Sequence, residues 1–419
     1  MNRNSFWAAS GKALAVLAFM FMLIFILAPS ARAQATEKVL YSFTGGKDGA
    51  DPHQGLIFDQ AGNVYGTTFD HGLHRSGNIY TLIPNADGTW TQSVLYSFKG
   101  GGDGGAVDWG RLTFDATGNL YGATYAGGRR AGTIFQVTPN GDGTWTENVL
   151  HRFTGGKDGA QPRTVPYFDA QGNMYGTAAY GGAYGCGTAF ELTPGPDNQW
   201  TYHVIHQFKG TGCSPWVGLI PDQAGNLYGT TRNDVGGCSN PPTNCGTVFQ
   251  LTPTTGGKWT YKVIHKFKGG KGGSDPSVSG LIFDDTGTLY GSTQAQGVHN
   301  SGLFFKLTLG ANDKWQYSVL HQFKKKADGI YPDGQFARDA SGNIYGTTGA
   351  GGPYGGGTLY KMTPNPDGTW TFIVIWAFGA GNDGVSPMGG PVLDAAGNLY
   401  GTTVVGGDYG YGTIYEITP

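Results

Sequence analysis

The sequence predicts an all-β protein, a single seven-bladed β-propeller of four-stranded antiparallel blades whose ring is closed by an N-terminal strand that completes the last blade. Three observations predict this fold. One motif, Asp-x-x-Gly-Asn-aliphatic-Tyr-Gly, recurs seven times along the chain. Each copy carries four short strand signals, and the two ends of the chain hold complementary fragments of one copy.

The composition is typical of a folded β-protein. The 419 residues include 75 glycines, and aromatic and charged residues make up 13% each. Disordered chains lack aromatic residues to bury, and this chain has many. The net charge of −2 gives no basic footprint for nucleic acid or an anionic membrane. The composition therefore excludes a nucleic-acid binder, a coiled coil and a long-helix protein.

The hairpin motif sets the repeat length. Six copies begin at Asp59, Asp115, Asp169, Asp222, Asp339 and Asp394, and a seventh begins at Asp284 with Thr288 in place of Asn. Successive copies are 53 to 62 residues apart. Seven units of about 55 residues fill residues 34–419, so we expect one propeller there and no second domain.

Each copy predicts its four strands in order. The first strand covers residues 56–59 and the second residues 63–68, joined by a tight turn in which Asp accepts hydrogen bonds and Gly takes a positive φ. The third reads aromatic-polar-aliphatic in all seven copies, which indicates a half-buried strand. It begins at Tyr80, Phe135, Phe190, Phe249, Phe305, Tyr360 and Tyr415. The fourth runs from Trp90 to Phe98, and its first Trp recurs in five more copies.

The ends of the chain predict how the ring closes. Residues 39–43 read as a fourth strand without the first three, and Pro419 follows a third strand without a fourth. Together they make one blade. Closure removes the open sheet edges that invite aggregation.

These motifs resemble a known family. The segments FTGGKDGADP, GLIFDQAGNVYGTT and GGDYGYGTIYEITP are similar to the GloVer tandem repeat of exported bacterial proteins, and the resemblance covers all seven copies. It implies an exported propeller in a functionally uncharacterised family, so it implies no catalytic residues. Members often carry a C-terminal cell-surface anchor, which we do not expect here because this sequence ends on the repeat. Blade four departs most, with Lys-Gly-Thr-Gly-Cys in place of the Gly-Gly-x-Asp-Gly-Ala segment and an insertion.

The N-terminus predicts a targeting segment. Arg3 and Lys12 precede an apolar run over residues 13–28, and residues 31–33 read Ala-Arg-Ala. This is the pattern of a secretory signal peptide over residues 1–33, cleaved before Gln34. The alternative is a membrane anchor, but 16 residues span roughly 24 Å of a ~30 Å hydrocarbon core. We expect an extracytoplasmic protein, secreted, periplasmic or at the cell surface, with no membrane span after cleavage.

The four cysteines favour disulfides. Cys186, Cys213, Cys238 and Cys245 form an even set, as expected for an exported protein. Spacing alone allows three pairings. Because Cys238 and Cys245 bracket a Pro-rich insertion, we expect them to pair locally, which leaves Cys186 with Cys213. The CxxC-like pairs of a zinc site are absent.

Several other motifs have structural explanations. His151, His206, His265 and His321 occupy one repeated position, held by Tyr or Trp in the other copies, where packing is expected. Loop carboxylates such as Asp48, Asp51, Asp158 and Asp275 suit turns better than calcium. His71 and His74 have no third partner, so no metal is expected. Glycine-rich matches such as residues 352–357 lack a following helix, so we expect no nucleotide and no other cofactor.

Functional residues should lie where copies differ at one shared position. Six residues before each hairpin Asp, directly before the innermost strand, the chain reads His53, Trp109, Arg163, Trp216, Val278, Asp333 and Met388. We expect this position to ring the mouth of the central channel. The ligand-binding candidates are His53, Trp109, Arg163, Trp216 and Asp333. The alternative is that these loop residues vary without a functional role, and that the Trp side chains pack on neighbouring loops.

Three functions fit this pattern. The first is an exported binding module for a glycan, because Trp stacks on sugar rings while Arg and Asp form hydrogen bonds. The second is a structural or protein-interaction propeller that contacts a surface protein. The third is a polysaccharide lyase or hydrolase, for which His53, His71, Arg163 and Asp333 are the acid/base candidates. No catalytic motif is present, so an enzyme is the least favoured of the three.

Overall fold

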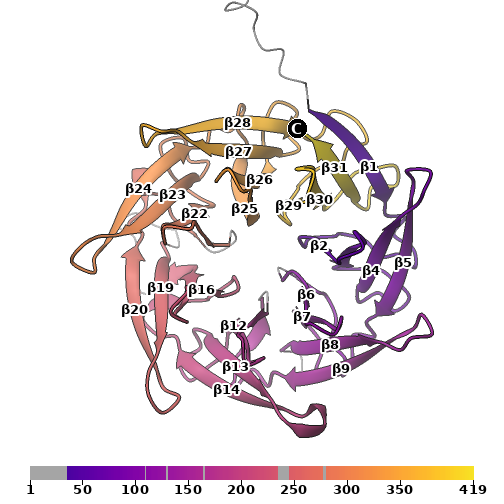
Figure 1. The fold of residues 1–419 in the computed structure, drawn as a ribbon, viewed down its shortest axis with the longest axis horizontal. Coiled ribbons are helices and arrows are strands. Elements are labelled where there is room, and N and C mark those ends of the chain that lie inside the picture. Colours follow the sequence, from indigo (N-terminus) through magenta and orange to yellow (C-terminus); the bar gives the residue numbers. More distant parts are fainter. Residues whose placement is uncertain (1–34, 109, 129–130, 164–165, 235–244, 277–279) are drawn as a thin grey trace, which may run out of the picture.

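The computed structural model describes residues 35–108, 110–128, 131–163, 166–234, 245–276 and 280–419. They form seven antiparallel blades around a central axis, as Figure 1 shows, which confirms the predicted fold. The predicted signal peptide, residues 1–33, lies outside the described residues. No helix among the described residues has the length and apolar character needed to cross a bilayer.

Each blade has four strands, and in every blade but the sixth the inner strand is short and the outer strand is long. Blade 1 holds β2 (Ile57–Phe58), β3 (Val64–Thr68), β4 (Asn78–Pro84) and β5 (Trp90–Ser97). Blade 2 holds β6 (Thr113–Phe114), β7 (Leu120–Thr124), β8 (Thr133–Pro139) and β9 (Trp145–Arg152). Blade 3 holds β11 (Tyr167–Phe168), β12 (Met174–Tyr180), β13 (Thr188–Pro194) and β14 (Trp200–Gln207), with β10 (Ala160–Pro162) also paired to β12.

The second half of the ring repeats this order. Blade 4 holds β16 (Ile220–Pro221), β17 (Leu227–Thr231), β19 (Thr247–Pro253) and β20 (Trp259–Lys266). Blade 5 holds β21 (Ile282–Phe283), β22 (Leu289–Thr293), β23 (Leu303–Leu309) and β24 (Trp315–Gln322). Blade 6 holds β25 (Ile330–Arg338), β26 (Ile344–Ala350), β27 (Thr358–Pro364) and β28 (Trp370–Ala377). Blade 7 holds β29 (Val392–Leu393), β30 (Leu399–Thr403), β31 (Thr413–Thr418) and β1 (Thr36–Ser42).

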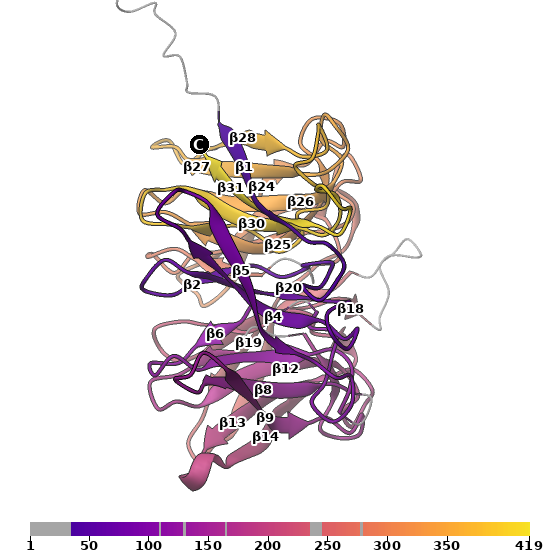
Figure 2. The same ribbon diagram turned by 90° about the vertical axis from the view of Figure 1, so that its right-hand side faces the viewer.

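Loops carry a few further elements. β15 (Thr211–Cys213) and β18 (Asn233–Asp234) pair beside blade 4, and the short 3₁₀ turns η1 (Pro196–Asn198) and η2 (Gly270–Gly272) lie in the loops of blades 3 and 5. Figure 2 shows the ring edge-on, with its connecting loops on two opposite faces.

The ring closes as predicted. β1 pairs antiparallel with β31, and the register matches Thr36 with Thr418 and Ser42 with Thr413. Figure 1 shows β1 as the outer strand beside the C-terminal strands. The first described strand therefore completes the last blade.

The hairpin Asp explains the repeated motif. Asp59 Oδ1 accepts backbone hydrogen bonds from Ala61 and Asn63, both at 2.9 Å, while Oδ2 accepts from Asn63 Nδ2 at 2.8 Å and the Tyr65 hydroxyl at 3.1 Å. Blade 5 keeps the backbone and Tyr contacts through Asp284, with Thr288 in place of Asn. Asp, Asn and Tyr are thus repeated to hold the turn.

The third strand follows the predicted alternation. Its aromatic and aliphatic residues, Tyr80 and Leu82 in blade 1, are fully buried. The polar residue between them is buried in blades 1 and 2, as Thr81 and Gln136, and is partly exposed in the other five blades. The motif glycine makes this packing possible, since a Cβ at Gly66 would lie 2.4 Å from the Tyr80 hydroxyl.

The outer strands meet in what we call the outer seam, built by the repeated His/Tyr/Trp position. His206 stacks on Tyr261 of the next blade at 4.2 Å, and equivalent stacks join His151 to Tyr202, His265 to Tyr317 and His321 to Phe372. In other blades Tyr41, Tyr96 and Trp376 donate to Asp48, Asp103 and Asp383. The predicted packing role of these residues is confirmed, as is the turn role of Asp48, which accepts from Thr44 N.

Candidate functional site

A left-handed residue marks the entrance of every blade. Its φ lies between 53° and 61°, and backbone hydrogen bonds tie it to the loop that follows the second strand, for example from Phe69 N to Asp51 O. These residues are Asp51, Ala106, Gln161, Ser214, Asp275, Tyr331 and Ser386. We call the residue two places further along the mouth position. It is held by His53, Asp108, Arg163, Trp216, Ser277, Asp333 and Met388.

Counting from the left-handed residue changes the residue assigned to the mouth position in two blades. Counting back from the hairpin Asp selects Trp109 and Val278, because blades 2 and 5 have one more residue than the others between the left-handed residue and the hairpin. Asp108 is the residue equivalent to His53. Trp109 and Val278 both lie outside the described residues.

Asp108 connects two of the predicted candidates. Its carboxylate lies 3.3 Å from His53 Nδ1 and 3.3 Å from Arg163 Nη2. Asp108 and Arg163 are only 5% and 8% exposed, so this is a buried ion pair between neighbouring blades. His53 also stacks on Phe69, with ring centroids 4.9 Å apart.

Trp216 continues the same network. The Arg163 guanidinium lies 4.2 Å from its ring centroid and the Arg232 guanidinium lies 4.1 Å from it, and both are cation–π contacts. Arg232 Nε in turn donates to Asp275 Oδ2 at 3.1 Å. We call the set His53, Asp108, Arg163, Trp216, Arg232 and Asp275 the mouth belt. It runs through blades 1 to 5.

The mouth belt contains buried donors without acceptors. Arg163 Nε and Trp216 Nε1 are buried and have no hydrogen-bond partner. Arg232 is the more accessible cation, because its side chain is 28% exposed whereas that of Arg163 is 10% exposed. An oxygen-rich group at the belt could therefore reach the exposed N–H groups of Arg232.

Asp333 stands apart from the belt. Its side chain is buried, with 1% exposure for the residue, and Oδ1 accepts from Gln294 Nε2 at 3.0 Å while Oδ2 has no partner. Burial, reinforced by the negative charge of Asp275, raises the pKa of Asp333 to about 8. Asp333 is therefore largely protonated at neutral pH.

The structure joins three predicted candidates, His53, Arg163 and Trp216, and separates Asp333 from them. Sequence reasoning missed Asp108, Arg232 and Asp275. A signal for Arg232 exists at the position ten residues after each hairpin Asp, at or near the end of the second strand, which also varies between copies. It reads Phe69, Tyr125, Ala179, Arg232, Gln294, Gly349 and Val404.

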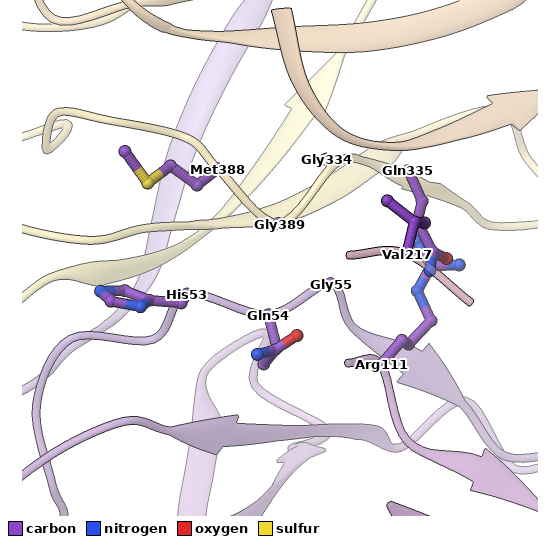
Figure 3. A pocket seen from close by; sticks show the side chains of 9 residues that line it. All are labelled: His53, Gln54, Gly55, Arg111, Val217, Gly334, Gln335, Met388 and Gly389. Carbon is purple, nitrogen blue, oxygen red and sulfur yellow. The ribbon is translucent and has the colours of Figure 1, made fainter. Parts of the chain in front are cut away.

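A small cavity of about 20 Å³ lies at the ring axis beside the mouth position. Figure 3 shows its lining, which comes from five blades. The lining residues are His53, Gln54, Gly55, Arg111, Val217, Gly334, Gln335, Met388 and Gly389. Inner loops touch here, since a Cβ at Gly389 would lie 2.4 Å from Gln54 O. The axis is therefore narrow at this level.

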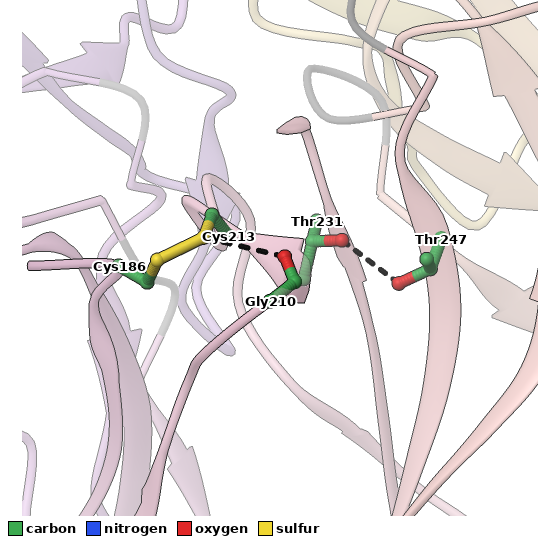
Figure 4. The surroundings of a disulfide bond; sticks show 5 residues. All are labelled: Cys186, Gly210, Cys213, Thr231 and Thr247. Atoms are coloured by element: carbon green, nitrogen blue, oxygen red, sulfur yellow. Dashed lines mark hydrogen bonds between the residues drawn. A yellow bond between two sulfur atoms is a disulfide. The ribbon is translucent and has the colours of Figure 1, made fainter. Parts of the chain in front are cut away.

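The cysteines and the loop histidines were further predicted sites. Cys186 and Cys213 form a disulfide, which Figure 4 shows linking the loops of blades 3 and 4. Cys245 is also disulfide-bonded, and its predicted partner Cys238 lies outside the described residues. His71 Nδ1 lies 3.7 Å from Asp70, and the described residues contain no cluster of three metal-ligating side chains.

Comparison with protein families identifies the repeat. The model of the Gloeobacter/Verrucomicrobia repeat matches residues 23–243 and 235–419. The chain belongs to the Gloeobacter/Verrucomicrobia repeat family. No curated protein matches it.

Similar solved structures show the fold alone. A Lactobacillus plantarum protein is 16% identical, with a TM-score of 0.54 over 81% of this chain and 88% of that chain. A putative oxidoreductase (glucose dehydrogenase) of Thermus thermophilus is 16% identical, with a TM-score of 0.42 over 74% and 96%. An ancestral GH74 enzyme is 13% identical, with a TM-score of 0.47 over 73% and 41%.

Proposed function

We propose that this chain is an extracytoplasmic binding module that holds an acidic glycan at the mouth of its ring. The observation that carries the proposal is the pair of guanidinium groups held against Trp216, of which that of Arg232 is partly exposed. An exposed guanidinium can donate charge-assisted hydrogen bonds to an incoming oxygen-rich group. A ligand rich in carboxylate and hydroxyl oxygens supplies the acceptors.

The positions of these charges support a role beyond folding. Burying Asp108 and Arg163 is costly even when they are paired, and blades 6 and 7 place Asp333 and Met388 at the mouth position without such a pair. The blade itself does not require an ion pair there. We infer that the pair organises a binding surface.

The chemistry of the belt favours an acidic sugar over a neutral one. Arg232 offers a partly exposed guanidinium, whose planar fork suits a carboxylate. Trp216 has both cations against its ring, so it positions the guanidinium groups instead of serving as a separate platform. Exposed aromatic rings for stacking lie in the loops after the second strand, at Tyr184, Tyr354 and Tyr409.

Two further observations bear on the cell compartment and on catalysis. The Cys186–Cys213 disulfide is compatible with an oxidising, extracytoplasmic compartment. A lyase or hydrolase would need an acid/base pair that reaches its substrate, and Asp333 is too buried to do so. We therefore favour binding over turnover.

The test is a glycan array probed with residues 34–419, followed by titration of the best acidic and neutral oligosaccharides. Arg232→Met is expected to weaken acidic-glycan binding about tenfold or more and to flatten its salt dependence. Trp216→Ala is expected to weaken binding severalfold, because it releases both guanidinium groups.

The matched control is Lys262→Met, which removes one positive charge from an exposed side chain on the outer strand β20. It should leave binding unchanged. If no glycan on the array binds, or if Arg232→Met and Lys262→Met behave alike, the proposal is wrong. A protein-interaction propeller then becomes the better account.

A further inference from the structure

The ring axis carries one cationic side chain. Four residues before each hairpin Asp, the chain reads Gly55, Arg111, Val165, Gly218, Gly280, Gln335 and Gly390. Gly55, Arg111 and Gln335 come from three different blades and line the same small cavity, which places this position at the axis. Arg111 is the only charged residue at this position in the seven copies. Such an exception to a repeated position needs a reason.

Arg111 also lines a larger cavity further along the axis. This cavity, which we call the hairpin-side well, has a volume of about 380 Å³. Its lining consists of Leu56, Ile57, Phe58, Arg111, Phe336, Ala337, Arg338, Pro391, Val392 and Leu393. The well is wide open to solvent. Eight of its ten lining residues are apolar and lie on or beside the innermost strands β2, β25 and β29, but about half of the surface that they and the two arginines expose is polar.

The hairpin-side well is distinct from the mouth belt. In blade 1 the chain passes the mouth position at His53, then Gly55 at the axis, and then β2, which leads to the hairpin Asp59. The well is lined by β2 and therefore lies on the hairpin side of the axis. The lining residues of the well include none of the mouth belt.

The two arginines of the well differ in their partners. Arg338 donates to both oxygens of Asp285, at 3.0 and 2.8 Å, so its charge is paired. Arg111 Nε and Nη2 are buried without a hydrogen-bond partner. No carboxylate whose side chain the structure describes forms an ion pair with Arg111.

Arg111 nevertheless keeps its charge at neutral pH. Burial lowers its pKa to about 10, which still leaves the guanidinium protonated. The site also leaves room for it, because a Cβ at Gly55 would lie 2.7 Å from Arg111 Nε. The Arg111 residue is partly exposed, so its cation is partly buried and has no described anionic partner. An anion that reaches its exposed side is expected to stabilise it.

We propose that the hairpin-side well binds a small organic anion, a carboxylate with an apolar alkyl or aryl body. The carboxylate would pair with Arg111 at the inner end of the well, and the apolar body would lie against Ile57, Phe336 and Val392. A recess of a few hundred Å³ that combines apolar side chains with a few orienting polar groups is a usual form of a small-molecule site. Because Arg338 is already paired with Asp285, Arg111 is the group that selects the charge of the ligand.

The experiment measures binding of four probes to residues 34–419 by calorimetry and thermal shift, in a buffer without carboxylates. Benzoate and hexanoate carry both charge and body, acetate carries the charge alone, and benzyl alcohol carries the body alone. Benzoate is expected to bind at least about tenfold more tightly than benzyl alcohol and more tightly than acetate. Equal binding of benzoate and benzyl alcohol, or of benzoate and acetate, overturns the proposal.

Arg111→Met tests the assigned cation, and Arg338→Met is the matched control in the same well. Arg111→Met is expected to abolish the preference for benzoate over benzyl alcohol and to keep the melting temperature of the free protein, because it removes a cation that pairs with no described carboxylate. Arg338→Met should retain the preference. Unchanged benzoate affinity in Arg111→Met overturns the proposal. If Arg111→Met does not fold, the wild-type protein decides the question. The proposal then stands only if benzoate binds the wild type more tightly than both benzyl alcohol and acetate, and otherwise it is overturned.

Discussion

The outer seam and the mouth of the ring both vary from blade to blade, but they vary in opposite ways. In the seam, each residue at the variable position keeps a contact partner. Where the position is His, the next blade offers an aromatic ring, as His206 does with Tyr261. Where it is Tyr or Trp, its own blade offers an Asp acceptor, as Tyr96 does with Asp103. The variation preserves the packing.

At the mouth and the axis, variation introduces charged side chains. Asp108 and Arg163 form a buried pair, and Arg111 replaces the glycine found at this position in four of the seven blades. Neither variation nor an unsatisfied polar atom marks a site by itself, because the seam has both, as Glu37, Gln92 and Glu147 show. The mouth differs from the seam in that two guanidinium groups gather on one Trp ring.

The N-terminal segment 35–43, whose strand β1 closes the ring on β31, is called the latch below. Removing it should have the largest effect on the fold, which the seam and the mouth share. Deleting residues 35–43 leaves blade 7 with an open edge on β31. The truncated protein is expected to lose its cooperative unfolding transition or to aggregate. Thermal unfolding and size-exclusion chromatography check this, and an unchanged melting temperature would refute the latch.

Breaking the blade 3–blade 4 disulfide should have the next largest effect. Cys186 and Cys213 are 27 residues apart, and a closed loop of that length corresponds to about 3.5 kcal/mol of stabilisation. Cys186→Ser with Cys213→Ser should lower the free energy of unfolding by about that amount in urea titrations. Mass spectrometry of the unreduced wild type should show this link, the predicted Cys238–Cys245 link and no free thiol.

Asp333, at the mouth position of blade 6, should make the stability of the protein depend on pH. Its pKa is about 8 in the folded protein against 3.8 for the ordinary group, so the folded state keeps a proton that the unfolded state loses. This contribution to stability is complete below pH 4 and is lost as the pH rises to about 8. Asp333→Asn should therefore stabilise the protein at pH 8 relative to pH 5, by on the order of 4 kcal/mol. Parallel melting curves for wild type and variant across this range would contradict the assignment.

The seam should show the reverse trend and a smaller effect. Burial, with Lys209 and Lys268 nearby, lowers the pKa of His206 and His265 to about 4. Their contribution is complete above pH 6.5 and is lost as the pH falls towards 4. Replacing both with Phe preserves the stacks and should make the protein more resistant to acid, by on the order of 1 kcal/mol per site after solvent screening. The exposed neighbour His203, changed to Phe, is the control that should not move the acid transition.

The fold could be predicted from the sequence because each blade is specified by residues that are close together in the chain. The hairpin Asp, the buried third strand and the half-blades at the two ends each follow from residues close together in the chain. The mouth was less predictable for two physical reasons. One extra residue in blades 2 and 5 shifts the count from the hairpin Asp, so Trp109 was selected where Asp108 is the equivalent residue.

The second reason is that the contacts of the mouth join distant residues. Arg232 reaches Asp275 in the next blade, 43 residues away, and no local pattern reports that the two side chains meet. The lack of a partner for Arg111 is likewise a property of the packed ring. The repeated positions could be deduced from the sequence. Which buried polar groups have hydrogen-bond partners could be determined only from the folded structure.

The latch has a mechanical consequence. Because β1 and β31 are antiparallel, Thr36 pairs with Thr418 at one end of the ladder and Ser42 pairs with Thr413 at the other. Tension applied between the two ends of the propeller therefore loads the Thr36–Thr418 end first and peels the strands apart one hydrogen bond at a time, instead of shearing all of them together. A ring closed in this way withstands heat as a unit but opens under a small pulling force.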